Sequence, residues 1–415
     1  MARIRIKNFG PIRQGRLDND GWLDIKKVSV FIGNQGSGKS CVAKLISIFT
    51  WIEKALTRGD YAIHDFTAEK FRKNYCGYHR IERYFYGYGH EDATEIEYEG
   101  EAYSMKYDKG NFHIVECPTQ EYHLPQIMYV PAERNFISII KEAKSFKALP
   151  DSLLEYLTEF NNAKDAIKGH LALPINEANI EYDKQRDVIN VTGPDYKVEL
   201  SEASSGFQSL VPLFLVSWYL ANTVKRQVDN PQKMSQNESQ RFNEGVKSIW
   251  ADKSLTDEQR RIALSALSSQ FNKTAFVNIV EEPEQNLFPV SQRKMLNSLL
   301  ELNNLSKDNK LIVTTHSPYI IFDLSLSVKA YQVAEKMSLA AKMDNGQAEL
   351  DKIVPPGSRL PADNLVIYEI TNEGQISRLA DYNGLPSDEN YLNELLAECG
   401  YLFADLLELE DKYGK

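Results

Sequence analysis

Residues 28–41 of the chain are Val-Ser-Val-Phe-Ile-Gly-Asn-Gln-Gly-Ser-Gly-Lys-Ser-Cys. The apolar, β-branched run over residues 28–32 predicts a buried strand, and the apolar periodicity after residue 40 predicts a helix. The turn between them matches the pattern G-x-x-x-x-G-K-[ST] at Gly33, Gly38, Lys39 and Ser40. A strand, a glycine-rich loop and a helix in this order predict a phosphate-binding loop.

Each residue type in this loop has a chemical reason. Glycines let backbone N–H groups curl around a polyphosphate, and the helix N-terminus adds partial positive charge. Lys39 can reach the β- and γ-phosphates, and the Ser40 hydroxyl is the expected Mg²⁺ ligand. We therefore predict ATP and Mg²⁺ as cofactors, with a plain glycine-rich turn as the alternative. The predicted nucleotide-binding residues of the loop are Gly33, Asn34, Gln35, Gly36, Ser37, Gly38, Lys39, Ser40 and Cys41.

Composition indicates an ordinary globular protein. The 415 residues are 42% apolar and 26% charged, which is enough for a large core and two or three lobes. No apolar run approaches the ~18 residues that span a bilayer, and the four cysteines are scattered, so we expect a cytoplasmic protein without a disulfide framework. The net charge of −10 argues against a surface built for non-specific nucleic-acid binding.

Two further strand ends carry candidate catalytic residues. The apolar run over 275–280 leads into Glu281 and Glu282, and adjacent carboxylates at a buried strand end are costly without a cation or a shared proton. We assign Glu281 to the metal and Glu282 to the water that attacks the γ-phosphate. His316 follows the apolar run 311–315 and is predicted to sense the γ-phosphate. The alternatives are an exposed Glu pair and a structural histidine.

Two other segments leave alternatives open. Ser205 and Gly206 begin a very apolar helix and form either a second phosphate cradle or ordinary helix capping. The segment 60–115 interleaves basic and aromatic residues, which suits either a nucleic acid or acidic partner, or a partly exposed helix and hairpin. The second alternative is favoured there because no periodicity aligns the basic residues of 70–83. An amphipathic helix is predicted over 390–413.

The order of these motifs resembles the ABC-type ATPases of the SMC and RecF branch, including AAA-labelled ATPases of bacterial anti-phage systems. Residues 33–40 resemble the Walker A loop, 204–208 the ABC signature, 277–282 the Walker B strand and 284–287 the D-loop. His316 takes the place of the switch histidine. Phe207 replaces the second signature glycine, and Glu281 replaces the usual Walker B aspartate. The Q-loop position stays open among Gln126, Glu133 and Arg134, with the last two preferred.

The resemblance implies an α/β fold of the ABC-type ATPase head: a P-loop core sheet with N-terminal β-strands, a helical lobe that carries the signature, and a small C-terminal α+β extension. It divides the chain into an N-terminal ATPase lobe (1–135), a helical lobe (136–273), a Walker B and switch-histidine part (274–325) and an extension for assembly or partner binding (326–415). It also implies a head-to-head homodimer in which Ser205 and Gly206 face the partner's Walker A loop across ATP.

Missing features indicate the subclass. The chain shows no sustained heptads, no C-x-x-C zinc hook and no room after His316 for a Toprim nuclease domain. It therefore resembles standalone ATPase subunits of two-gene defence systems, above all the AriA-type ATPases of PARIS systems. This resemblance implies a larger homo-oligomer, with a hexamer as one candidate. It also implies two partners, a separate effector nuclease (Toprim-type favoured over HNH) and a phage trigger protein. We expect no membrane partner and no nuclease activity in this chain. The alternative is a RecF-like DNA-binding ATPase of DNA repair.

Overall fold

The computed structural model describes residues 2–86, 93–118, 122–139, 149–229, 236–252, 267, 273–339 and 343–414. A seven-stranded sheet forms the centre of the molecule, with strand order β2-β16-β15-β4-β14-β13-β8. These strands are β2 (Gly15–Arg16), β4 (Val28–Gly33), β8 (Pro125–Val130), β13 (Ala275–Glu281), β14 (Lys310–Thr314), β15 (Leu365–Ile370) and β16 (Gln375–Arg378). The five from β15 to β8 are parallel, so their carboxyl ends meet at one edge.

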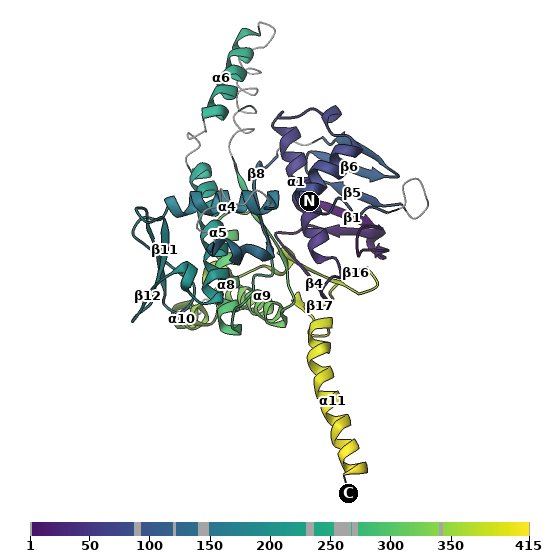
Figure 1. The fold of residues 1–415 in the computed structure, drawn as a ribbon, viewed down its shortest axis with the longest axis vertical. Coiled ribbons are helices and arrows are strands. Elements are labelled where there is room, and N and C mark those ends of the chain that lie inside the picture. The colour runs from purple at the N-terminus through teal and green to yellow at the C-terminus, as the bar shows by residue number, and fades with distance from the viewer. Residues whose placement is uncertain are drawn as a thin grey trace.

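The central sheet is covered on both faces, as its almost continuously apolar strands require. Alternate residues of β4 belong to two different cores, with Val30 on one face and Phe31 on the other. The face of Phe31 is covered by α1 (Lys39–Thr57), and the opposite face by α4 (Asp151–Asp165), α5 (Ser205–Asp229), α8 (Pro289–Asn303) and α9 (Pro318–Leu339). Figure 1 shows these helices on either side of the central strands. The predicted α/β fold, with the loop strand inside a mostly parallel sheet, is confirmed.

A second, antiparallel sheet lies beyond α1 and has the order β3-β1-β5-β6-β7. Its strands are β1 (Arg3–Lys7), β3 (Trp22–Asp24), β5 (Glu95–Glu99), β6 (Tyr103–Asp108) and β7 (Asn111–Glu116). Aromatic rings pack between it and α1, including Phe71 with Phe112 (centroids 4.5 Å apart) and Phe49 with Tyr98 (5.2 Å). Much of the aromatic content of 60–115 is therefore core packing.

Three basic residues of that segment contact acceptors within it. The ammonium of Lys70 donates to the Asp65 carbonyl (2.9 Å), that of Lys73 pairs with Glu69 (2.7 Å), and the Arg72 guanidinium donates to the Glu82 carbonyl (3.4 Å). Because these three basic side chains already contact acceptors of the protein, the structure gives less support to nucleic-acid binding by this segment.

The helical lobe differs in part from the sequence-based expectation. The pattern over 136–168 predicts one continuous helix, but Ala132–Ser138 forms a 3₁₀ turn and α4 begins only after Pro150, whose fixed φ suits the position just before a first helical turn. Residues 140–148 lie outside the described residues. The lobe also holds a four-stranded sheet of β9 (His170–Ala172), β10 (Asn179–Asp183), β11 (Val188–Thr192) and β12 (Lys197–Glu199).

The sequence from about residue 222 to 273 is rich in Gln, Asn and Lys and predicts a polar, helical insertion. This part does not begin as a separate unit, because α5 continues to Asp229. Its described part also includes α6 (Gln236–Ala251), which projects from the body (Figure 1). Helix α5 is long and apolar enough to cross a membrane by composition, but most of it is buried inside the protein. Such burial is typical of a helix in the protein core.

The segment 326–415 contributes directly to the central sheet. Strand β15 pairs in parallel with β4, and β16 pairs antiparallel with β15. The boundary at residue 326 stays a prediction, but the segment that follows it is not wholly an extension. A hydrophobic run in the last part of a chain can complete a sheet that begins near the N-terminus, and sequence order alone does not reveal this.

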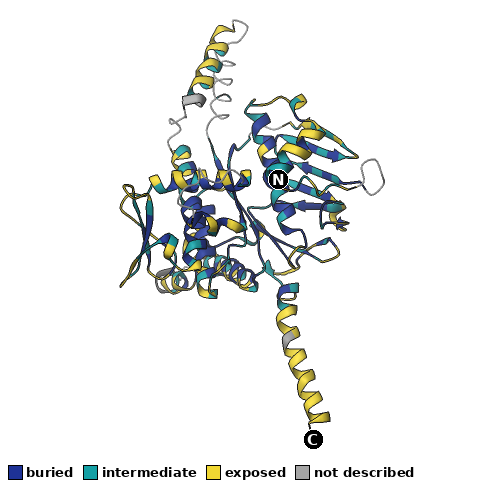
Figure 2. Cartoon of the chain, viewed as in Figure 1, coloured by how far each residue is buried: buried dark blue, intermediate teal, exposed yellow. Residues whose placement is uncertain are grey.

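Helix α11 (Tyr391–Tyr413) extends away from the body (Figures 1 and 2). The helix itself is confirmed, but its predicted apolar face is buried only at its first turn, at Leu392. Five other residues of that apolar face are exposed: Leu395, Leu396, Leu402, Phe403 and Leu406. In addition the structure has α10 (Met343–Ile353) and a small hairpin of β17 (Asp381–Tyr382) and β18 (Leu385–Pro386).

Candidate nucleotide site

The glycine-rich loop has backbone geometry that only glycine accommodates at two of its positions. Gly33 ends β4 with φ +142°, and a Cβ there would lie 2.3 Å from the carbonyl oxygen of Ile370 in β15. Gly38 precedes α1 with φ +112°, and its Cβ would lie 3.0 Å from Cγ1 of Ile12. The loop therefore packs closely between β15 on one side and Pro11 and Ile12 on the other, and it leads into the N-terminus of α1.

Lys39 lies at the start of α1 and is almost completely buried. Its ammonium donates to the carbonyls of Asn34 (2.7 Å) and Gly33 (3.0 Å), inside the loop. Burial lowers the pKa of Lys39 to about 8, against the opposing effect of the nearby carboxylates Glu282, Glu284 and Glu281. A bound polyanion would stabilise the charged form of this lysine, because a nearby negative charge offsets the cost of burying the ammonium.

The rest of the loop is divided between exposed and buried groups. Asn34, Gln35 and Gly36 are exposed, and a Cβ at Gly36 would meet no atom within 4 Å. The hydroxyl of Ser37 is buried without a hydrogen-bond partner, and Ser40 is half-buried on the first turn of α1. Open space beside the loop and an unpaired hydroxyl suit a phosphate cradle.

Cys41, also predicted to bind nucleotide, is different in character. Its side chain lies in the core under α1, where burial raises the pKa of its thiol to about 12. Its N–H donates to the carbonyl of Gly38 (3.0 Å). Only its backbone is therefore near the loop.

Two glutamates lie at the carboxyl end of β13. Glu281 is buried; its Oε2 accepts from the N–H of Ala132 (3.3 Å), while its Oε1 is buried without a hydrogen-bond partner. Glu282 follows with φ +46°, a left-handed conformation that is costly for a side chain with a Cβ. Its N–H donates to the carbonyl of Thr314 at the end of β14 (2.8 Å), which holds this bend in place.

His316 lies directly beside Glu282. Its Nε2 is 3.5 Å from Oε1 of Glu282, and this hydrogen-bonding contact is the main cause that lowers the pKa of the Glu282 carboxyl. The backbone N–H of His316 donates to Oε1 of Glu284 (2.7 Å). Burial raises the pKa of the Glu284 carboxyl, and this hydrogen bond opposes the shift. An ionised Glu282 held by a histidine has the geometry of a proton acceptor beside a polar sensor.

Arg134 holds these elements together. Its guanidinium is completely buried and donates to four backbone carbonyls, those of Glu282 (2.5 Å), Glu281 (2.6 Å), Ser209 (3.2 Å) and Pro131 (3.3 Å). Burial lowers its pKa, and the three nearby glutamates of 281–284 oppose that shift. Of the Q-loop candidates, Arg134 is thus inside the site as a positioning residue, Glu133 is exposed, and Gln126 lies in β8 away from the loop's edge of the sheet.

The segment that resembles the signature lies beside the turn after β13. A Cβ at Gly206 would lie 3.1 Å from the carbonyl oxygen of Asn286, and the Asn286 amide donates to the Ser209 hydroxyl (2.9 Å). Ser204 and Ser205 are exposed at the start of α5. Lys39, Glu281, Glu282 and His316 therefore lie at or after the ends of adjoining strands at one edge of the sheet, whereas Ser205 lies exposed at the start of α5.

These residues fit a magnesium–nucleotide complex. The unpaired Oε1 of Glu281 and the Ser40 hydroxyl are oxygen donors of the type that Mg²⁺ prefers. Among the residues that the structure describes, no group of three His, Cys, Asp or Glu side chains could hold a metal ion alone. A metal here would accordingly be bound largely through phosphate oxygens and water, with few protein ligands.

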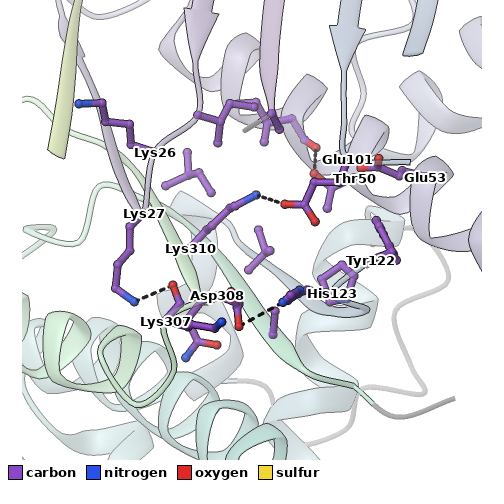
Figure 3. A pocket seen from close by; sticks show the side chains of 18 of the residues that line it. Lys26, Lys27, Thr50, Glu53, Glu101, Tyr122, His123, Lys307, Asp308 and Lys310 are labelled. Atoms are coloured by element: carbon purple, nitrogen blue, oxygen red, sulfur yellow. Dashed lines mark hydrogen bonds and ion pairs between the residues drawn. The ribbon is translucent and has the colours of Figure 1, made fainter. Parts of the chain in front are cut away.

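A different cavity, of about 240 Å³, lies at the opposite edge of the sheet, next to the first residues of β8, β13 and β14. Figure 3 shows two ion pairs among its charged side chains, Lys310 with Glu101 (3.4 Å) and His123 with Asp308 (3.5 Å). Lys27 donates to backbone carbonyls, the shortest to that of Ser306 (2.6 Å). Its charges do not converge on a common point, and we assign it no part in nucleotide chemistry.

Comparison with known families gives one match, which covers the part of the chain that carries Glu281, Glu282 and His316 but not the glycine-rich loop. The family model described as "AAA ATPase domain" matches residues 91–321. This chain belongs to the AAA ATPase domain family. A comparison with curated proteins finds no matching sequence.

Similar solved structures include an Smc head bound to the C-winged-helix domain of ScpA, at 12% identity and a TM-score of 0.34, with 77% of this chain and 91% of that chain covered. A nucleotide-free ATP-binding cassette of an ABC transporter has 10% identity and a TM-score of 0.27, with coverages of 92% and 93%. A dimeric bacterial ABC transporter cassette has 11% identity and a TM-score of 0.24, with coverages of 92% and 100%. The fold assignment rests on the strand order of this chain, not on these scores.

The depressed pKa of Lys39 predicts a pH dependence for ATP binding. Bound phosphates favour the charged ammonium, so the pKa of Lys39 rises on binding, and above the free-state value of about 8 the protein must take up a proton when it binds. Affinity for ATP should then fall as pH rises through 8, by up to about tenfold per pH unit. Titration calorimetry in buffers of different ionisation enthalpy measures both the affinity and the proton uptake.

Two variants act as controls for this prediction. Lys39→Arg should lose the pH dependence, because a guanidinium stays charged throughout this range. Lys44→Ala, on the same helix, should keep it. A pH-independent affinity in the unmodified protein would contradict the state assigned to Lys39.

Proposed function

We propose that this chain is an ATP-hydrolysing, ABC-type ATPase that closes head to head with a second copy around two ATP molecules. The observation that carries the proposal is the convergence of Lys39, Glu282 and His316 at one edge of the sheet while Ser205 faces outward from the same chain. One chain thus supplies one half of a nucleotide site together with a separate, exposed helix start. A second copy in reversed orientation would complete both sites.

Each residue has a stated role in this proposal. Lys39 and the N–H groups of the loop bind the phosphates, Ser40 and Glu281 hold Mg²⁺, and the metal offsets the charge of the transferred phosphoryl group. Glu282, ionised and held by His316, orients the attacking water and accepts its proton. Ser205 and Gly206 of the second copy bind the other side of ATP. Closing the dimer excludes water, and hydrolysis reopens it.

We further propose that this cycle controls a separate effector nuclease in anti-phage defence, as in the AriA-type ATPases of PARIS systems. Here the chain, with ATP and Mg²⁺, assembles with itself into a larger oligomer in the cytoplasm, holds a Toprim-type or HNH nuclease, and releases it when a phage trigger protein binds. The support is the resemblance of the motifs, together with the exposed apolar surface of α11, which suits assembly or partner binding. The RecF-like alternative has less support, because Lys70, Arg72 and Lys73 contact their own segment.

Replacing Glu282 tests the catalytic assignment. Glu282→Gln retains the size of the side chain but cannot accept a proton, so ATP should still bind while phosphate release falls by about 100-fold or more. The closed dimer should accumulate with ATP and be visible as a doubled mass by light scattering. The exposed Glu373→Gln serves as the matched control. An unchanged rate in Glu282→Gln would show that the base is assigned wrongly.

Mixing two inactive variants tests the composite site. Lys39→Ala lacks the phosphate-binding lysine, and Ser205→Glu places a negative charge where the partner's ATP would lie; each alone should be inactive. In a mixed dimer, one of the two sites combines an intact loop with an intact Ser205, so the mixture should regain phosphate release that neither parent shows. If the mixture stays inactive, or Ser205→Glu alone keeps full activity, the head-to-head arrangement is excluded.

The effector role is tested by co-expression with the product of the neighbouring gene. We expect a complex of fixed stoichiometry that is silent as a nuclease until the ATPase is triggered. The chain alone, with Mg²⁺ and ATP, should cut neither DNA nor RNA. Cleavage by the isolated chain, lost in Glu282→Gln, would contradict the division of labour between two proteins.

A further inference from the structure

A cavity of about 470 Å³ lies away from the loop, between the second half of α1 and the edge strand β8. Its remaining wall comes from the π-helical turn Phe71–Tyr75, from α3 (Cys76–Tyr78) and from Glu155 of α4. Ligand pockets of this size are typically apolar, with a few polar groups that fix the ligand's orientation. Its lining follows that pattern and includes Ile48, Trp51, Tyr75, His79, Tyr129 and Glu155.

Aromatic rings form the outer wall of this cavity. The rings of Trp51 and Tyr75 have centroids 5.4 Å apart, and Trp51 remains 37% exposed. The hydroxyl of Tyr78 donates to the Glu155 carboxylate, which fixes that side of the wall. Partly exposed rings that border an open space can stack on a flat ligand.

The inner end of the cavity carries two buried polar side chains without partners. His79 and Tyr129 are only 3% and 4% exposed, and neither Nδ1 of His79 nor the Tyr129 hydroxyl has a hydrogen-bond partner. Their rings are in edge-to-face contact, with centroids 4.6 Å apart. Burial lowers the pKa of His79 to about 3, so its imidazole is neutral and offers one donor and one acceptor. Unpaired polar groups in such a position are rare, because they cost stability unless something binds them.

We propose that this cavity binds the nucleobase of a free nucleoside, separately from ATP at the glycine-rich loop. The base stacks on Trp51 and Tyr75, and its polar edge meets His79 and Tyr129. A hydrocarbon ring would leave both polar groups unpaired. A nucleic-acid strand needs a basic track for its phosphates, whereas Lys70 and Lys73 are engaged within their own segment.

The same two side chains connect this cavity to the catalytic edge. His79 and Tyr129 also line a neighbouring cavity of about 560 Å³ that reaches Glu281. The predicted metal ligand Glu281 thus borders the same space as the two side chains at the inner end of the nucleoside cavity. Occupancy of the nucleoside cavity therefore alters ATP turnover, an effect that rests on the proposed ATPase function, whereas binding itself does not.

The experiment measures binding of adenosine, guanosine, cytidine and uridine by calorimetry to full-length Lys39→Ala protein without ATP. We expect at least one nucleoside to bind saturably. Adding Trp51→Ala should weaken it at least fivefold, as expected from the loss of one stacking partner. Trp51 is partly exposed, so this variant should fold; Trp250→Ala, on α6 outside the cavity, is the matched control and should bind normally.

Three outcomes would overturn the proposal. These are no nucleoside binding up to millimolar concentration, binding that is insensitive to Trp51→Ala, or binding of a single-stranded oligonucleotide but of none of the nucleosides. Turnover is then followed in protein with an intact Lys39 at saturating ATP, where the bound nucleoside should change phosphate release and Trp51→Ala should remove the change. An unchanged rate despite binding would overturn the connection to Glu281, while failure of the ATPase itself would leave the binding result standing.

Discussion

The candidate nucleotide site depends on the hydrogen bonds that the buried guanidinium of Arg134 donates to backbone carbonyls. These hydrogen bonds join the 3₁₀ turn after β8, the end of β13 and the first turns of α5. A planar group with five donors is well suited to backbone carbonyls that converge from several directions. Without it, the carbonyls of Glu281 and Glu282 would be left without their donor at about 1–3 kcal/mol each, and the strained φ of Glu282 would lose its support.

This constraint connects the two halves of the proposed machine. Arg134 binds the backbone carbonyls of Glu281 and Glu282 and also the carbonyl of Ser209, four residues after the exposed Ser205. In the proposed dimer, a movement of α5 on contact with the second copy would therefore reach the backbone next to Glu282. Hydrogen bonds to a charged donor are strong and directional, which makes such a coupling specific. Dimer closure and hydrolysis would thus be linked within each chain.

The sequence predicted what is local and not what depends on distant segments. The loop, the buried strands and the glutamate pair could be recognised because each motif lies within a few residues and its chemistry follows from residue type. The sequence left the Q-loop position open among three residues. It could not single out Arg134, because the carbonyls that Arg134 binds lie up to 148 positions away in the chain. The pairing of β15 with β4 likewise brings together strands from opposite ends of the chain. No pattern in the sequence marked His79 and Tyr129 as lining a cavity, since an unpaired buried polar atom is visible only in three dimensions.

The central claim is that a second copy of this chain completes the ATP site. A structure of the Glu282→Gln protein with ATP and Mg²⁺ tests it most directly. The account predicts two nucleotides at a symmetric interface, with Lys39 of one copy and Ser205 of the other copy contacting the same γ-phosphate. A monomer that binds ATP on its own, or a dimer in which Ser205 remains exposed to solvent, would contradict it.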